Sequence, residues 1–140
     1  MNYADKKYSK ELAWLFPESE KVIVEYWDSC RKECIFDRKR LPNPKYQGSF
    51  NGCDEWEHYP AINTDMALEV LPYLIHAKSI HGFDTDYILG LHKRKKDWLV
   101  SYGMFKEATD KLFVEALCAM IEYLVKEGII KEELRNGKEA

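Results

Sequence analysis

The sequence predicts a soluble α+β domain in which helices pack on a small antiparallel β-sheet. Two observations support this fold class. Apolar and polar residues alternate on both sides of the turn KRKKD, which predicts a β-hairpin over residues 86–102. Apolar residues recur at helical spacing over residues 112–124, which predicts a long amphipathic helix. Because a lone hairpin is unstable in water, we expect it at the centre of an alpha-beta-alpha, sandwich-like arrangement.

The composition fits one globular domain over residues 1–140. Hydrophobic residues make up 46% of the 140-residue chain and aromatic residues 14%, which is enough to bury a core. The 21 Lys and Arg residues face 24 Asp and Glu residues, and the net charge of -3 argues against a general nucleic-acid-binding protein. No segment approaches the run of about 18 apolar residues that spans a bilayer. The first residues also lack the apolar core of a signal peptide, so we expect a cytoplasmic protein with free thiols and no membrane partner.

The N-terminal third is the hardest part of the chain to assign. Ser9 is a candidate N-cap for a short helix over residues 10–16, which Pro17 ends. Residues 18–40 fit both a helix and a strand. Helical spacing relates Val22, Tyr26, Cys30 and Cys34. The run VIVEYW is β-rich, however, and we favour a strand over residues 21–27.

The rest of the chain has clearer boundaries. Residues 41–63 contain several prolines, glycines and asparagines and predict a long loop. A helix follows Asn63, and Pro72 kinks it or ends it early. Thr109 is the expected cap of the C-terminal helix, which ends near Lys126. Gly128 follows that end, and residues 131–140 form a charged tail that we expect to fray.

The segments YPAINTDMALEVLPYL, DYILGLHKRKKDWLVSY and ATDKLFVEALCAMIEYLVKEG occur in that order over roughly residues 56–127. In this order they resemble the phage ABA sandwich domain family. The matching features are Asn63, Thr64 and Asp65, then Trp98, then Thr109 and the run Glu115, Ala116, Leu117 and Cys118. The resemblance implies a bacteriophage or prophage origin and a helix–sheet–helix fold, and it implies no particular chemistry. Small phage proteins often antagonise host defences, some of them by sequestering nucleotide signals.

Asn63, Thr64 and Asp65 have two interpretations. A Thr nucleophile with an Asp base would need an oxyanion hole and a correctly placed base, neither of which adjacent residues supply. Capping explains the same residues more simply. Asn63 or Thr64 accepts hydrogen bonds from the first helical turn, and Asp65 meets the positive end of the helix dipole. We therefore predict no catalytic residues here.

A zinc site is the alternative that the cysteines raise. The spacing of Cys30 with Cys34, and of Cys53 with His58, could supply a Cys₃His set for a small metal-supported module or enzyme. Neither pair has the usual Cys-x₂-Cys spacing, and free cysteines often pack as small apolar groups. We favour the structural interpretation and expect no cofactor.

Two basic runs are candidate ligand-binding residues. One is Lys93, Arg94, Lys95 and Lys96 at the hairpin turn, and the other is Arg38, Lys39 and Arg40. Such clusters hold anions, although a solvated turn whose charges discourage edge pairing has the same composition. Trp56 and Tyr59 are candidates for stacking on a base.

The sequence thus favours a non-catalytic binding protein encoded by a phage or prophage and acting in the host cytosol. Its expected partner is a host-defence protein or a small nucleotide signal. The two alternatives are the zinc-supported module and a homo-oligomeric interaction domain that associates through the apolar helix.

Overall fold

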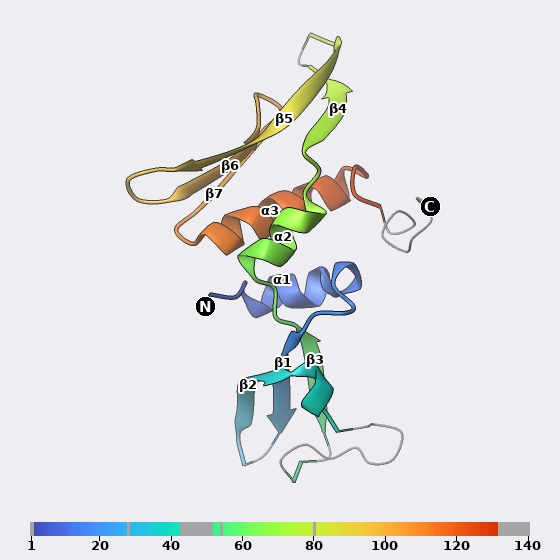
Figure 1. Cartoon of the computed structure of the whole chain (residues 1–140), viewed down its shortest axis with the longest axis vertical. Coiled ribbons are helices and arrows are strands. Elements are labelled where there is room, and N and C mark those ends of the chain that lie inside the picture. The colour runs from blue at the N-terminus through green and yellow to red at the C-terminus, as the bar shows by residue number, and fades with distance from the viewer. Residues whose placement is uncertain (1, 28, 43–51, 54, 80, 132–140) are drawn as a thin grey trace. The chain divides into compact units, whose positions relative to one another are not determined.

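The computed structural model describes residues 2–27, 29–42, 52–53, 55–79 and 81–131. Where the sequence predicts one domain, the chain folds into two compact units. The N-terminal unit is Asp5–Ile62, and the C-terminal unit is Asn63–Ala140 together with Met1–Ala4. Each contains one antiparallel sheet (Figure 1), which confirms the α+β class. Within the described ranges, no helix is long and apolar enough to cross a membrane.

The N-terminal unit is a three-stranded sheet with a short helix against it. Its elements are α1 (Lys6–Glu11), η1 (Ala13–Leu15), β1 (Lys21–Trp27), β2 (Arg31–Asp37), η2 (Arg38–Arg40) and β3 (Trp56–Pro60). The strand order is β2-β1-β3, so the apolar strand β1 is central. The predicted strand over residues 21–27 is confirmed.

Two predictions for this unit are wrong. The first helix begins at Lys6 because Asp5 caps it, with its carboxylate 2.9 Å from the backbone nitrogen of Lys7. Ser9, the predicted cap, lies buried inside this helix. The expected loop over residues 41–63 contains strand β3, which pairs with β1. Of that loop, residues 43–51 and 54 lie outside the described residues.

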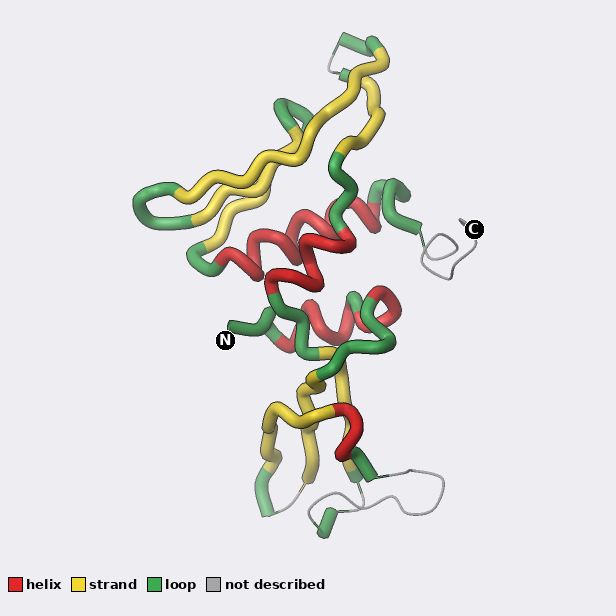
Figure 2. The backbone as a smooth tube through the Cα atoms, viewed as in Figure 1, coloured by secondary structure: helices red, strands yellow, loops and turns green. Residues whose placement is uncertain are grey.

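The C-terminal unit is a four-stranded sheet with two helices. Its elements are α2 (Thr64–Val70), β4 (Leu74–Lys78), β5 (Asp84–Lys93), β6 (Trp98–Tyr102), β7 (Lys106–Asp110) and α3 (Phe113–Lys126). The strand order is β4-β5-β6-β7 (Figure 2). The predicted hairpin over residues 86–102 is confirmed, and its two strands are the central pair of the sheet.

The helix boundaries in this unit confirm the early end that Pro72 predicts and correct the predicted Thr109 cap. Helix α2 ends at Val70, since Pro72 cannot continue it, and Leu74 begins strand β4. Thr109 does not cap the last helix but lies in strand β7, and α3 begins at Phe113. The end of α3 at Lys126 agrees with the prediction. Residues 132–140 of the expected tail lie outside the described residues.

The core of the C-terminal unit is the apolar face of α3, which packs on β6 and β7, while α2 packs on α3. The side chains of this face are at most 2% exposed: Val114, Ala116, Leu117, Cys118, Met120, Ile121 and Leu124. From the sheet, Val100 and Tyr102 are fully buried. The hydroxyl of Tyr102 donates to the carbonyl oxygen of Pro72 at 2.6 Å, which ties the segment after α2 to strand β6.

Candidate functional site

The turn between β5 and β6 places four basic side chains together: Lys93, Arg94, Lys95 and Lys96, here called the hairpin tip. Lys93 pairs with Trp98 as the last pair of the ladder. The backbone nitrogen of Arg94 then donates to the carbonyl oxygen of Asp97 at 2.8 Å, which closes the turn. All four basic side chains of the tip are exposed. The sequence therefore predicted the composition and the place of this cluster correctly.

The basic residues of the tip are not equivalent, because Arg94 is bound by its neighbour Asp97. The guanidinium Nε and Nη2 of Arg94 lie 2.7 and 2.8 Å from the two carboxylate oxygens of Asp97. This bidentate pair lowers the pKa of Asp97 and raises the pKa of Arg94. The charge of Arg94 is thus balanced within the turn, and Lys93, Lys95 and Lys96 supply its excess positive charge.

The tip is anchored to the core through Trp98. The indole of this half-buried residue stacks on Phe113 of α3, with ring centroids 4.4 Å apart and an interplanar angle of 24°. The ammonium group of Lys93 lies over the same indole, 5.6 Å from the ring centroid. Strand pairing, the backbone hydrogen bond from Arg94 to Asp97 and this stack hold the turn in one geometry.

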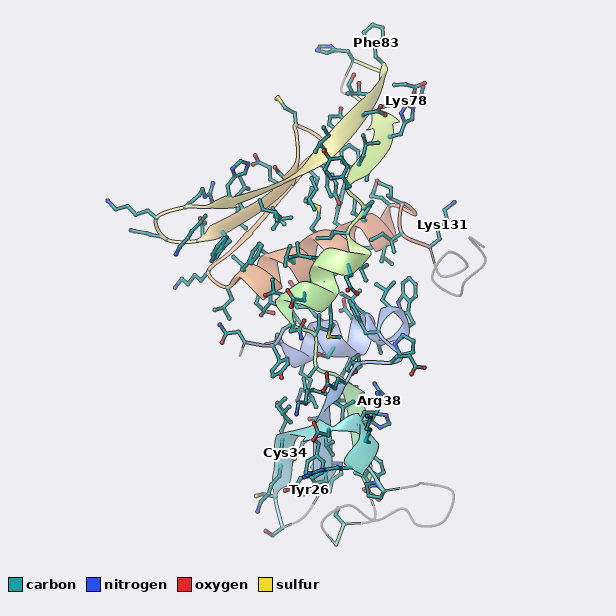
Figure 3. The ribbon with its side chains drawn as sticks, in the orientation of Figure 1. Tyr26, Cys34, Arg38, Lys78, Phe83 and Lys131 are labelled. Carbon is teal, nitrogen blue, oxygen red and sulfur yellow. The ribbon has the colours of Figure 1, made fainter. Side chains whose placement is uncertain are left out.

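The second basic run, Arg38, Lys39 and Arg40, forms the 3₁₀ turn η2 of the N-terminal unit. Arg38, labelled in Figure 3, donates to the backbone oxygen of Ser19 at 2.6 Å and to its Oγ at 2.8 Å. Arg40 lies 3.8 Å from the carboxylate of Asp37. Arg38 therefore joins η2 to Ser19, just before β1. Lys39 and Arg40 are the exposed members of the run.

Trp56 and Tyr59, the stacking candidates, lie on opposite faces of strand β3, because successive side chains of a strand alternate. Trp56 pairs with Tyr26, and its ring centroid is 5.7 Å from that of His58. Tyr59 is 8% exposed, and the ammonium group of Lys10 lies over its ring. The ring of Tyr59 is therefore part of the core of its unit, and the two rings do not form one stacking surface.

A group that the sequence analysis missed is Glu25, whose side chain is 2% exposed in the central strand of the N-terminal sheet. Ion pairs join its carboxylate oxygens to Lys6 at 2.7 Å, Arg31 at 2.9 Å and Lys10 at 3.6 Å. The hydroxyl of Tyr59 lies 2.9 Å away. We call this set the Glu25 network.

The Glu25 network keeps a buried carboxylate ionised. Burial alone raises the pKa of Glu25, but hydrogen bonds from Lys6, Tyr59 and Arg31 outweigh it and lower the pKa to about 2. The Tyr59 hydroxyl also lies 2.7 Å from Glu57, and its single proton can go to only one carboxylate at a time. A signal in the sequence was a single acid inside the run VIVEYW, which a buried strand tolerates only with partners.

The cysteines proposed as zinc ligands differ in their exposure. Cys30 is exposed, Cys34 and Cys53 are half-buried, and the thiol of Cys53 donates to the backbone oxygen of Glu55 at 3.2 Å. In the part of the chain that the structure describes, no three His, Cys, Asp or Glu side chains are grouped to hold one metal ion. Cys118 is fully buried in the core on α3, and this burial raises the pKa of its thiol to about 12.

Asn63, Thr64 and Asp65 form a helix start. The side-chain oxygen of Asn63 accepts from the backbone nitrogen of Met66 at 2.9 Å, and Asp65 lies in the first turn of α2. The capping prediction is confirmed for Asn63, and the dipole argument accounts for Asp65.

The hairpin tip is consequently the strongest candidate site that the described residues offer. Comparisons of the chain with models of protein families, with curated proteins and with solved structures find no match.

Proposed function

We propose that this protein is a non-catalytic binding protein that contacts its partner through the hairpin tip. The observation that supports this proposal is the exposure of Lys93, Lys95 and Lys96 on a turn held by the backbone hydrogen bond from Arg94 to Asp97 and by the Trp98–Phe113 stack. A preorganised group loses little conformational entropy on binding, so fixed cations bind an anionic partner better than mobile ones. Charges at such a position also accelerate encounter with an oppositely charged partner.

The resemblance to the phage ABA sandwich domain family supplies the biological part of the proposal. On that basis the protein is encoded by a phage or prophage and antagonises a host defence in the host cytosol. Its partner is a defence protein or, alternatively, a nucleotide signal that it sequesters. The resemblance rests on sequence motifs alone.

The proposal is tested by plaque formation on bacterial strains that carry single defence systems, with the protein supplied from a plasmid. We expect the wild-type protein to restore plaques on at least one strain. The double variant Lys95→Glu/Lys96→Glu should fail to do so, because it replaces two positive charges of the tip by negative ones.

The matched control is Lys78→Glu/Lys126→Glu. It changes the net charge equally at two exposed lysines of the same unit, and it should restore plaques like the wild type. Equal rescue by both double variants would rule out the tip as the contact. If the wild-type protein rescues no strain, the defence-antagonist role is rejected.

A further inference from the structure

We infer that the hairpin tip recognises an acidic groove on a protein, in preference to a nucleotide or a nucleic acid. This inference rests on the proposed function and names the chemistry of the partner. It depends on the shape of the turn, on the internal contacts of Arg94 and Trp98, and on the carboxylates around the turn.

The shape of the tip does not suit a small ligand. Figure 1 shows the β5–β6 turn extending past the end of α3, and its four basic side chains are all exposed. Sites for small molecules are concave and bury most of the surface of the ligand. A protruding turn encloses nothing, and it fits instead into a depression on a larger partner.

The two side chains of the turn that recognise nucleotides best are already engaged. Arginine binds phosphate through a planar fork, but the fork of Arg94 lies on Asp97 with bonds of 2.7 and 2.8 Å. A base would stack on an aromatic ring, but the ring of Trp98 already stacks on Phe113. The groups that remain are lysine ammonium ions, which bind carboxylates and phosphates alike as point charges and add no contact specific to a nucleotide.

A nucleic-acid duplex is also disfavoured, because carboxylates border the tip. Asp97 ends the turn, and Asp110 of β7 is the strand partner of Trp98. Glu107, also on β7, is near enough to contribute to the raised pKa of Arg94. A duplex carries charge along its whole length and needs a continuous basic surface, whereas the chain has a net charge of -3. A local cluster of positive charge bordered by acids matches a local acidic groove.

The test compares three probes on the full chain by fluorescence anisotropy: a labelled poly-L-glutamate peptide of only a few residues, a fluorescent ATP analogue and a short labelled DNA duplex. We expect poly-L-glutamate to bind most tightly. The Lys95→Glu/Lys96→Glu variant should weaken that binding about tenfold or more, because it reverses two charges at the contact. The Lys78→Glu/Lys126→Glu control should bind like the wild type, and matching circular dichroism spectra and melting temperatures should show that both variants are folded.

The outcomes of this test distinguish a wrong partner from a wrong binding site. If the ATP analogue or the duplex binds more tightly than poly-L-glutamate, and the tip variant loses that binding, the tip is an anion site but the inferred partner is wrong. If no probe binds, or the tip variant binds all probes like the wild type, the proposed function of the tip is rejected as well.

Discussion

Both units bury apolar side chains, but in the N-terminal unit a charged side chain, Glu25, is buried between helix and sheet as well. In the C-terminal unit, α3 packs a face of apolar side chains against β6, β7 and α2, and these side chains are at most 2% exposed. In the N-terminal unit, α1 directs Lys6 and Lys10 onto the carboxylate of Glu25, in the middle of the sheet. Apolar burial has no preferred direction and depends on filled volume, whereas a buried charge depends on the placement of each partner.

This difference determines how each unit should respond to change. The C-terminal unit should be sensitive to lost volume and less sensitive to acid than the N-terminal unit. The N-terminal unit should be sensitive to the loss of a single carboxylate and to acid. The hairpin tip follows neither pattern, because the charges of its three lysines are exposed and are available for binding.

The largest effect is expected from Leu117→Ala in α3, where the side chain is fully buried. Removing it should lower the free energy of unfolding by about 2–5 kcal/mol, through lost transfer energy and the cavity left behind. Urea denaturation measures this, and hydrogen exchange should show the loss of protection concentrated in α3 rather than β1. Leu112→Ala is the control, because Leu112 is 44% exposed and its loss should cost less than about 1 kcal/mol. Equal costs for the two variants would contradict the assignment of the core.

Glu25→Gln should have the next largest effect. It keeps the shape of the side chain but removes the charge that Lys6 and Arg31 contact, and we expect a loss of about 1–3 kcal/mol in the free energy of unfolding. The control is Glu33→Gln, since that side chain is 50% exposed and its pair with Lys6 should contribute less than about 1 kcal/mol. If Glu25→Gln is as stable as Glu33→Gln, the network does not stabilise the N-terminal unit.

The same carboxylate should give this protein a specific acid sensitivity. The pKa of Glu25 in the folded state is about 2, below its ordinary value of 4.5. Its contribution is therefore fully present above pH 4.5 and is lost as the pH falls toward 2, up to about 3 kcal/mol in all. Urea denaturation at pH 7 and at pH 3 should show a smaller difference for Glu25→Gln than for the wild type. Identical pH dependence in the two proteins would refute the lowered pKa.

The smallest effect on stability, and a gain in binding, is expected from Asp97→Asn at the hairpin tip. The Arg94–Asp97 pair is an exposed ion pair, so the melting temperature should hardly change. Removing the carboxylate frees the charge of Arg94, and poly-L-glutamate should then bind about twofold to fivefold more tightly. Asp84→Asn makes the same change of net charge at the far end of β5 and should leave the affinity unaltered. A weaker affinity for Asp97→Asn would mean that the geometry of the turn matters more than its charge.

Local patterns in the sequence were sufficient for much of this fold. The β5–β6 hairpin, strand β1, the Asn63 cap and the end of α3 at Lys126 were all predicted, because each depends on residues close together in the chain. Strands β2, β3, β4 and β7 were missed. All four are edge strands, and each pairs with a central strand that supplies its hydrogen bonds, which local sequence patterns do not record.

The candidate site was likewise predictable from the sequence only in part. The sequence by itself determined that basic residues gather at a hairpin turn, since composition and alternation are properties of consecutive residues. Only the tertiary structure decided which of these residues are already engaged: Arg94 by Asp97, Arg38 by Ser19, and Trp98 by Phe113. It also decided that Glu25 is buried with partners from α1, β2 and β3. The Arg94–Asp97 pair spans only three residues, but the other contacts join side chains that folding brings together from distant segments, and no pattern of adjacent residues records them.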